Sequence, residues 1–284
     1  MKPVILLQTD FSLTWGAVAS MKGVIKLVDP TLEIQDLCHE IKAYDPWEAS
    51  LSLAAVEPYW PKGTVFVSVV DPGVGTDRKG CAALLKDGSI VVTPDNGTLT
   101  HLKHSPGIQE VREIDESINR FQGNEQVSVF HGRDIFGYCA ARLATGVISF
   151  AEVGPEYSVD EVRECEEYSM KPEFSGTSAN GFIMTGLSHF GGIQLNITNA
   201  EWQALGYKTG DEVRISFRRN GSEVFNHTVK YVPSFGYVAK GEPLLYCGSS
   251  GYLSIDCNQA NFMKKYSIGT GKEWTVHLEK ESEI

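Results

Sequence analysis

The first half of the chain carries side chains capable of chemistry directly after four short apolar stretches. These side chains are Asp10, Asp71, the pair Asp95 and Asn96, and His131. In an open α/β sheet, ligands bind at the carboxyl ends of the strands. If each apolar stretch is a strand, carboxylate, amide and imidazole groups reach the same edge of one sheet. One polar strand end is commonplace, whereas four of this composition indicate a site.

Each of these residues also has a simpler explanation. Asp10 could cap the segment that follows it, and Asp71 could form the turn before Pro72. His131 could be a hydrogen-bonded core histidine, and Arg78 the partner of a surface ion pair. A carboxylate at a strand end also suits the diol of a ribose, which is the functional interpretation of Asp10.

A metal site is the weaker alternative for the same residues. Asp71, Asp95 and His131 could ligate a divalent ion, but no H-x-x-x-H or D-x-D spacing supports this. We expect no metal. The aromatic residues Tyr44 and Trp47 are expected mainly to pack, with at most one or two aromatic side chains of that region facing a ligand.

The elements that must position these residues can be predicted from periodicity. Residues 65–70 are short, apolar and β-branched, which is typical of a strand buried on both faces. Further strands are predicted at 4–7, 32–37, 81–85, 89–93 and 127–130, with helices at 16–28, 46–56 and 135–145. The 81–85 and 89–93 strands flank Lys86-Asp87-Gly88 and predict a hairpin.

The second half of the chain has a different sequence pattern, made of short alternating segments. Residues 154–174 are acidic and lack periodicity, so they are predicted to be a linker. Short alternating segments separated by Gly, Asn and Pro then follow at 181–187, 193–198, 212–217, 223–231, 244–247, 251–256 and 273–279. We predict an α/β protein: an N-terminal α/β domain (1–165) with a mainly parallel sheet, and a C-terminal all-β, barrel-like domain (175–284).

Composition narrows the class of protein. The 284 residues carry a formal net charge of −11, which argues against a nucleic-acid-binding surface. The six cysteines show no C-x-x-C spacing, and no apolar run is long enough to span a membrane. We expect a soluble, cytoplasmic protein without nucleic-acid or membrane partners. The sequence also lacks the dinucleotide-binding, P-loop and nucleophile-elbow motifs.

Five motifs of the first half together resemble one family. They are Thr9-Asp10-Phe11, Met21-Lys22-Gly23-Val24-Ile25, Val70-Asp71-Pro72-Gly73-Val74-Gly75, Pro94-Asp95-Asn96-Gly97 and Phe130-His131-Gly132-Arg133-Asp134. The second half continues the match with Phe190-Gly191, Asn196-Ile197, Ser249-Ser250-Gly251-Tyr252-Leu253 and Asn258. In this order they resemble the S-adenosylmethionine (SAM) hydroxide adenosyltransferase family, whose members hydrolyse SAM to adenosine and are related to fluorinases and chlorinases.

The resemblance implies a homotrimer with sites between neighbouring subunits, and a role for each matching residue. Asp10 would hold the ribose hydroxyls, and Tyr44 would stack on the ligand. Asp71, Arg78 and His131 would handle the attacking water. Ser249 would meet the methionine carboxylate, and the stretch around Asn258 and Gln259 would meet adenine. Phe190 belongs to the same substrate-binding group.

The resemblance also separates hydrolysis from halogenation. Halogenating relatives carry tyrosines where this chain has Asp71 and His131. A carboxylate repels a halide but can orient water. The implied reaction is attack of water on the ribose 5′-carbon with methionine as the leaving group and no cofactor. We expect Asp71 to orient the water, Arg78 to stabilise charge, and His131 to accept the proton.

Several positions depart from the family pattern. Ser12 and Trp15 replace Gly and Asp, and Ser188 and Gly192 replace the Asp and Asn expected to hold the ligand's ammonium group and adenine. We expect weaker SAM binding unless His189 or Gln194 substitutes. Two other interpretations stay open: a non-catalytic nucleoside-binding protein on the same scaffold, and the same chemistry on another adenosyl compound.

Overall fold

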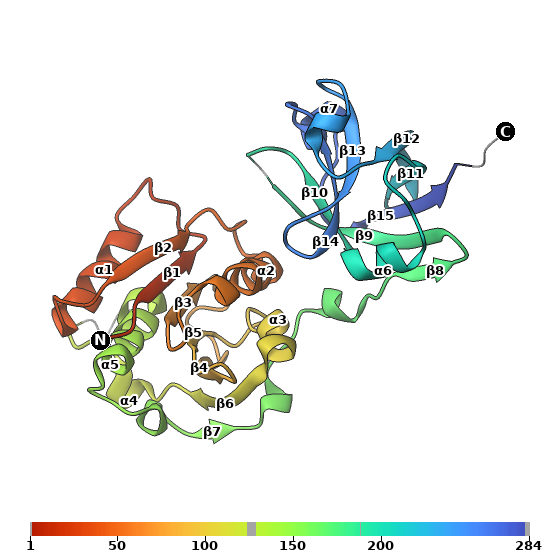
Figure 1. Cartoon of the computed structure of the whole chain (residues 1–284). Coiled ribbons are helices and arrows are strands. Elements are labelled where there is room, and N and C mark those ends of the chain that lie inside the picture. Colours follow the sequence, from red (N-terminus) through yellow and green to blue (C-terminus); the bar gives the residue numbers. More distant parts are fainter. Residues whose placement is uncertain (1, 124–128, 188, 282–284) are drawn as a thin grey trace. The chain divides into compact units, whose positions relative to one another are not determined.

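The protein consists of two compact units that divide between Tyr168 and Ser169. The computed structural model describes residues 2–123, 129–187 and 189–281. Figure 1 shows the first unit as a sheet with helices and the second as a body made mainly of strands. No helix in the described part of the chain combines the length and apolar character that a membrane crossing requires.

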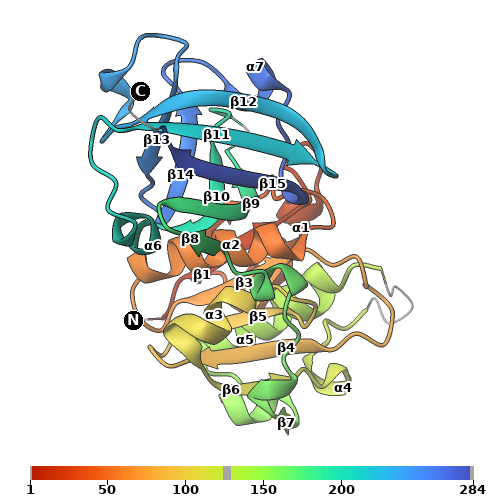
Figure 2. The same cartoon turned by 90° about the vertical axis from the view of Figure 1, so that its right-hand side faces the viewer.

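Unit 1 is built on a seven-stranded sheet with the order β2-β1-β3-β5-β4-β6-β7. The strands are β1 (Ile5–Thr9), β2 (Ile34–Cys38), β3 (Val65–Val69), β4 (Gly80–Leu85), β5 (Ile90–Pro94), β6 (Ile108–Glu113) and β7 (Glu156–Tyr157). The β2-β1-β3-β5 half is parallel, and the remaining neighbours are antiparallel. Five strands therefore run in one direction and only β4 and β7 run against them, which confirms a mainly parallel sheet. Figure 2 shows β3, β5, β4, β6 and β7 following one another across the unit.

Successive side chains of the central strands point to opposite faces of the sheet, and this explains why a separate core cluster forms on each face. In β3, Val65, Val67 and Val69 face one core cluster, whereas Phe66 belongs to the other. The first cluster is covered by α1 (Ala17–Val28) and α5 (Tyr138–Thr145), and the second by α2 (Pro46–Val56) and α3 (Thr100–Leu102). The strand is buried on both faces, as its unbroken apolar sequence predicts.

Local sequence signals account for the helices. In α1, Val18, Met21 and Ile25 repeat at helical spacing and are buried. In α2, Pro46 occupies the first turn, and the Asp45 carboxylate caps the helix by accepting from the backbone N–H of Glu48. A short α4 (Glu116–Asn119) follows β6.

Three predictions for unit 1 need correction. Residues 129 and 130 are not in a strand, and the other residues of the predicted 127–130 strand lie outside the described residues. His131 instead precedes the π-helical segment Gly132–Gly137, which continues into α5. The sequence analysis also missed β6, and part of the predicted linker is strand β7, which pairs with β6.

Unit 2 is a closed barrel. Its strands are β9 (Ser178–Gly186), β10 (Ile193–Thr198), β11 (Glu212–Arg219), β12 (Ser222–Tyr231), β13 (Pro243–Cys247), β14 (Tyr252–Cys257) and β15 (Gly271–Lys280). Each strand pairs with the next in the order β10-β14-β13-β12-β11-β15-β9, and pairing of β9 with β10 closes the ring. The short β8 (Glu173–Ser175) extends β9 outside it. These seven strands correspond to the seven predicted segments.

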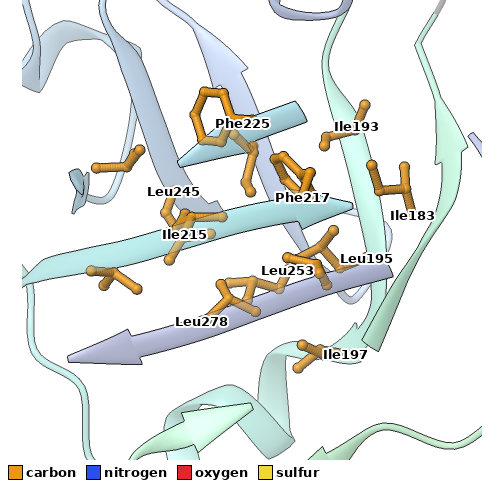
Figure 3. Packing of buried hydrophobic residues seen from close by; sticks show 14 of the residues in the cluster. Ile183, Ile193, Leu195, Ile197, Ile215, Phe217, Phe225, Leu245, Leu253 and Leu278 are labelled. Carbon is orange, nitrogen blue, oxygen red and sulfur yellow. The ribbon is translucent and has the colours of Figure 1, made fainter. Parts of the chain in front are cut away.

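The barrel interior is filled by alternate residues of its strands. Ile215 and Phe217 of β11, Leu253 of β14 and Leu278 of β15 converge there, as Figure 3 shows. Because inward and outward positions alternate, the residues between them face the outer surface. The helices α6 (Asn199–Ala204) and α7 (Phe262–Tyr266) lie at the ends of strands, and Trp202 and Phe262 join the core.

Candidate functional site

The loop after β3 brings Arg78 back onto Asp71. The backbone N–H of Val74 donates to the Asp71 carbonyl at 3.2 Å, and that of Thr76 donates to Gly73 at 3.1 Å. These turns reverse the chain within a few residues, as the Pro-Gly-rich sequence predicts. The Arg78 Nε then donates to Asp71 Oδ1 at 2.9 Å, and Nη2 donates to Oδ2. Only 5% of each side chain is exposed, so this is a buried, two-point ion pair.

His131 joins the same guanidinium group. Arg78 Nη2 lies 2.9 Å from His131 Nδ1. A guanidinium has only donors, so Nδ1 must be the unprotonated nitrogen that accepts, and the neutral ring carries its proton on Nε2. Burial lowers the pKa of His131 below its ordinary value, and the positive charge of Arg78 lowers the pKa further. His131 is therefore held neutral, with its lone pair already engaged.

Close packing fixes the position of His131. A side-chain carbon at Gly132 would lie 3.2 Å from atoms of both Phe11 and Val69, so glycine allows the helical segment to approach the ends of β1 and β3. The guanidinium carbon of Arg78 lies 5.2 Å from the centre of the Phe136 ring in the same segment. Helix packing, rather than a strand end, thus delivers His131 to the site.

Arg120 is a member of this site that the sequence analysis missed. Its Nη2 lies 2.7 Å from the Glu116 carboxylate and 3.4 Å from His131 Nε2, which is too long to compete with the 2.9 Å contact of Arg78 for the single lone pair of the ring. The only sequence signal was the Glu116–Arg120 spacing of four residues, which is typical of an ordinary helical ion pair. Nothing in that spacing points to His131.

Asp10 and Tyr44 also meet in unit 1. The Tyr44 backbone N–H donates to Asp10 Oδ2 at 3.0 Å. Tyr44 adopts a φ of 65°, a left-handed conformation that is uncommon for a tyrosine, and 74% of the residue is exposed. Asp10 follows β1 and Asp71 follows β3, and these strands are parallel neighbours, so both carboxylates lie at one edge of the sheet.

Asp95 and Asn96 occupy the expected edge but serve the fold. Asp95 Oδ2 accepts from the Tyr157 hydroxyl at 3.0 Å, and Oδ1 accepts from the Arg163 backbone N–H at 2.9 Å. The Asn96 side chain donates to the Val70 carbonyl at 2.8 Å. The two oxygens of Asp95 thus hold β7, through Tyr157, and the segment that follows it, through Arg163. Asp95 and Asn96 therefore hold parts of the fold together, and we no longer interpret them as part of the site.

Unit 2 contains a separate cavity of about 970 Å³. Four of the predicted substrate-binding residues line it: Phe190, Ser249, Asn258 and Gln259. His189 and Gln194, the two possible substitutes for the missing polar groups, line it as well. Ser188 lies outside the described residues. The barrel thus gathers residues that are up to about seventy positions apart in the sequence into one hollow.

Gly192 lies beside this cavity in an unexpected environment. A side-chain carbon at this position would lie 2.3 Å from Asp256 Oδ2, so the space of the missing side chain is already filled. Asp256 is buried and lines the cavity, and the sequence analysis did not single it out. Its signal was the alternation of β14, in which Ser254 and Asp256 stand between the core residues Leu253, Ile255 and Cys257.

Comparison with known proteins identifies the family of both halves of the chain. Residues 5–154 match the model of the SAM hydroxide adenosyltransferase N-terminal domain, and residues 187–275 match that of the C-terminal domain. The chain is 34% identical to an (R)-S-adenosyl-L-methionine hydrolase of Salinispora tropica, over 90% of each chain. It is 35% identical to a protein of the same name from Salinispora arenicola, over 96% of this chain and 97% of that one.

A solved structure extends the likeness to the fold. An uncharacterized conserved protein from Thermotoga maritima superposes with a TM-score of 0.86 at 31% identity, covering 97% of this chain and 99% of that chain. The two family models together cover most of the sequence and both units. The chain belongs to the SAM hydroxide adenosyltransferase family.

Proposed function

We propose that this protein hydrolyses S-adenosyl-L-methionine to adenosine and L-methionine. The observation that carries the proposal is the buried Asp71–Arg78–His131 cluster, in which one guanidinium group binds both a carboxylate that can orient water and an imidazole. Two relatives at 34% and 35% identity are named as hydrolases of this substrate, which supports the proposal. A fluorinase from an Actinoplanes species is also similar, at 27% identity.

The reaction requires little more than a well-placed water. The sulfonium makes methionine a good leaving group, so no general acid is needed, and the chain requires no cofactor or metal. Water attacks the ribose 5′-carbon, the carbon–sulfur bond breaks with its electron pair going to sulfur, and the attacking oxygen then loses a proton. Positioning of that water in line with the sulfur supplies most of the acceleration.

The geometry favours Asp71 over His131 as the group that holds the water. Arg78 engages one lone pair on each Asp71 oxygen, and each oxygen retains another that can accept from water. His131 Nδ1 is already occupied by Arg78 and its pKa is lowered, so the ring is a poor proton acceptor. We therefore reassign the proton to Asp71 and give His131 the role of fixing the Arg78 guanidinium.

The substrate-binding residues fall into two groups on the two units. Asp10 and Tyr44 of unit 1 would bind the ribose and stack on the ligand. Phe190, Gly192, Ser249, Asn258 and Gln259 of unit 2 would surround the base and the methionine, together with Ser188. We propose a homotrimer whose sites combine the two groups from neighbouring subunits. We also propose a cytoplasmic location, for which the six free cysteines are suitable.

Chromatography of the products tests the function. Purified protein is incubated with SAM, with and without chloride. Adenosine and methionine should form in equal amounts and chloride should change neither. A 5′-chloro product would show halogenation instead. No turnover together with tight adenosine binding would identify the non-catalytic alternative.

A further inference from the structure

Asp256 places a buried carboxyl group on the wall of the unit 2 cavity. It lies on β14 between Ile255 and Cys257, whose side chains enter the barrel core, so Asp256 points to the outer face. An outward aspartate normally meets water, but only 3% of this residue is exposed, and it lies in the wall of the cavity. Figure 3 shows Leu245 and Leu253 of the neighbouring strands β13 and β14 in the barrel core.

One oxygen of this carboxyl group is available for a ligand. Oδ1 accepts from the Cys257 backbone N–H at 2.8 Å. No group in the described parts of the chain donates to Oδ2, and the described lining of the cavity contains no lysine or arginine. Burial raises the pKa of Asp256. Ionised or protonated, the group still presents an acceptor oxygen to the cavity.

The absence of a side chain at Gly192 leaves the space that Asp256 Oδ2 occupies. β10 and β14 are paired with Ile193 opposite Ile255, which sets Gly192 beside Asp256. A side-chain carbon at Gly192 would lie 2.3 Å from Oδ2 and 2.8 Å from the carboxyl carbon. The carboxyl group therefore occupies the volume that any other residue at 192 would need. Glycine in place of the expected asparagine at 192 and the carboxyl group of Asp256 therefore belong together, because the glycine makes room for the carboxyl group.

The surroundings of Oδ2 suit a flat heteroaromatic ring. Phe190, Phe235 and Tyr246 line the cavity, and the rings of Phe235 and Tyr246 lie 5.3 Å apart. Tyr246 of β13 and Asp256 of β14 project from the same face of the sheet. In the register of these two strands Leu244 pairs with Asp256, and Tyr246 pairs with Ser254. Aromatic walls favour a stacked ring, and an acceptor that is open to the cavity beside them favours a ligand with an N–H donor in the ring plane.

We propose that Asp256 accepts a hydrogen bond from the exocyclic amino group of the ligand's purine ring and so selects an amino-bearing base. This inference rests on the proposed adenosyl substrate and adds the residue that reads its base. Loss of this donor would leave Oδ2 buried without a partner, so a purine with a carbonyl in place of the amine should bind more weakly.

Calorimetric titration with adenosine and inosine tests the inference. Neither nucleoside carries an ammonium group, and they differ only at one edge of the base: adenosine has an amine beside an unprotonated N1, and inosine has a carbonyl beside N1–H. The wild-type protein should bind adenosine on the order of tenfold more tightly than inosine. Asp256→Ala should remove this preference, and Asp256→Asn should reduce it, because an amide can turn its NH₂ group toward the carbonyl of inosine.

A second variant moves the carboxyl group without removing it. Gly192→Ala adds the carbon that would displace Oδ2, so it should reduce the preference. Gly236→Ala is the matched control, because a side-chain carbon there has no neighbour within 4 Å. It should bind both nucleosides as the wild type does.

The outcomes separate this inference from the proposed function. The inference is overturned if the wild-type protein fails to bind adenosine, or if Asp256→Ala retains the preference. It is also overturned if that variant weakens only SAM and methionine, since the carboxyl group would then meet the ammonium. If the protein prefers adenosine over inosine through Asp256 but does not turn over SAM, the inference is supported and the proposed hydrolase function is refuted.

Discussion

A single guanidinium group organises the catalytic cluster at the level of residues. Arg78 binds both oxygens of Asp71 and one nitrogen of His131, and this fixes the carboxylate plane and the histidine tautomer together. A planar fork of donors can do this, whereas a lysine ammonium cannot. The cluster is therefore ordered before any substrate arrives, which favours catalysis by positioning.

Loss of either partner of Arg78 should impair turnover more than binding. Asp71→Asn removes the carboxylate that orients water, and His131→Ala frees the guanidinium. We expect each to lower kcat by on the order of 10²-fold or more, with adenosine affinity little changed. Asp77→Asn removes a charge from an exposed residue of the same loop and should behave as wild type. Near-normal turnover in either cluster variant would contradict the assignment.

The state of His131 predicts an unusual pH profile. Its neutral ring accepts from Arg78, and protonation would place a second donor against the guanidinium. Burial, and then the charge of Arg78, lower its pKa below the ordinary value of about 6.5, so the neutral form persists into more acidic solution. We expect kcat to stay level as the pH falls through 6.5 and to decline only below it. A decline centred at or above pH 6.5 would show that the cluster does not hold His131 neutral.

The sequence predicted the members of this cluster better than their roles. Residue types and motifs pointed to Asp71, Arg78 and His131, which the structure brings together. The proton-acceptor role expected for His131 depended on its lone pair being free, and only the 2.9 Å contact with Arg78 reveals that it is occupied. Arg120 and Asp256 were missed because their importance depends on neighbours distant in the sequence.

At the scale of elements, the parallel half of the sheet places the site. β1 and β3 lie side by side and deliver Asp10 and Asp71 to one edge, while the packing of Gly132 against Val69 adds His131. β5 ends at the same edge, but Asp95 there accepts from Tyr157 and Arg163. One edge thus carries the carboxylates proposed to act on the substrate, Asp10 and Asp71, and one that holds the fold together, Asp95.

The structural role of Asp95 can be measured. Asp95→Ala deprives the Tyr157 hydroxyl and the Arg163 N–H of their acceptor, and should lower the free energy of unfolding by about 1–3 kcal/mol. Urea denaturation measures this change, and kcat per folded molecule should stay near wild type. The exposed Asp77→Ala should shift stability by less than about 0.5 kcal/mol. A loss of kcat with unchanged stability would return Asp95 to the catalytic site.

Strong periodicity made most elements predictable. The both-face burial of 65–70, the 81–93 hairpin and the seven barrel strands follow from local patterns. β6 was missed because its charged and polar residues interrupt the apolar signal, and it is a strand through pairing with β4 and β7. The strand predicted at 127–130 is absent at residues 129 and 130: Val129 is exposed, and Phe130 packs against the core just before the helical segment that begins at Gly132.

At the scale of the whole molecule, the candidate residues are distributed over two compact units. A site that needs both groups can be completed by a neighbouring subunit, as the proposed homotrimer provides. Light scattering should give a mass near three times 31.2 kDa. Dilution that dissociates the trimer should abolish turnover, and an active monomer would contradict this assembly.

The origin of the oxygen in the product tests the central claim most directly. The hydrolytic mechanism has water attack the ribose 5′-carbon, with Asp71 as the group that orients it. SAM is turned over in heavy-oxygen water, and the adenosine is analysed by mass spectrometry. The account predicts one heavy oxygen, located at the 5′-hydroxyl, and none in methionine. Adenosine without the label, or a 5′-halogenated product in its place, would contradict it.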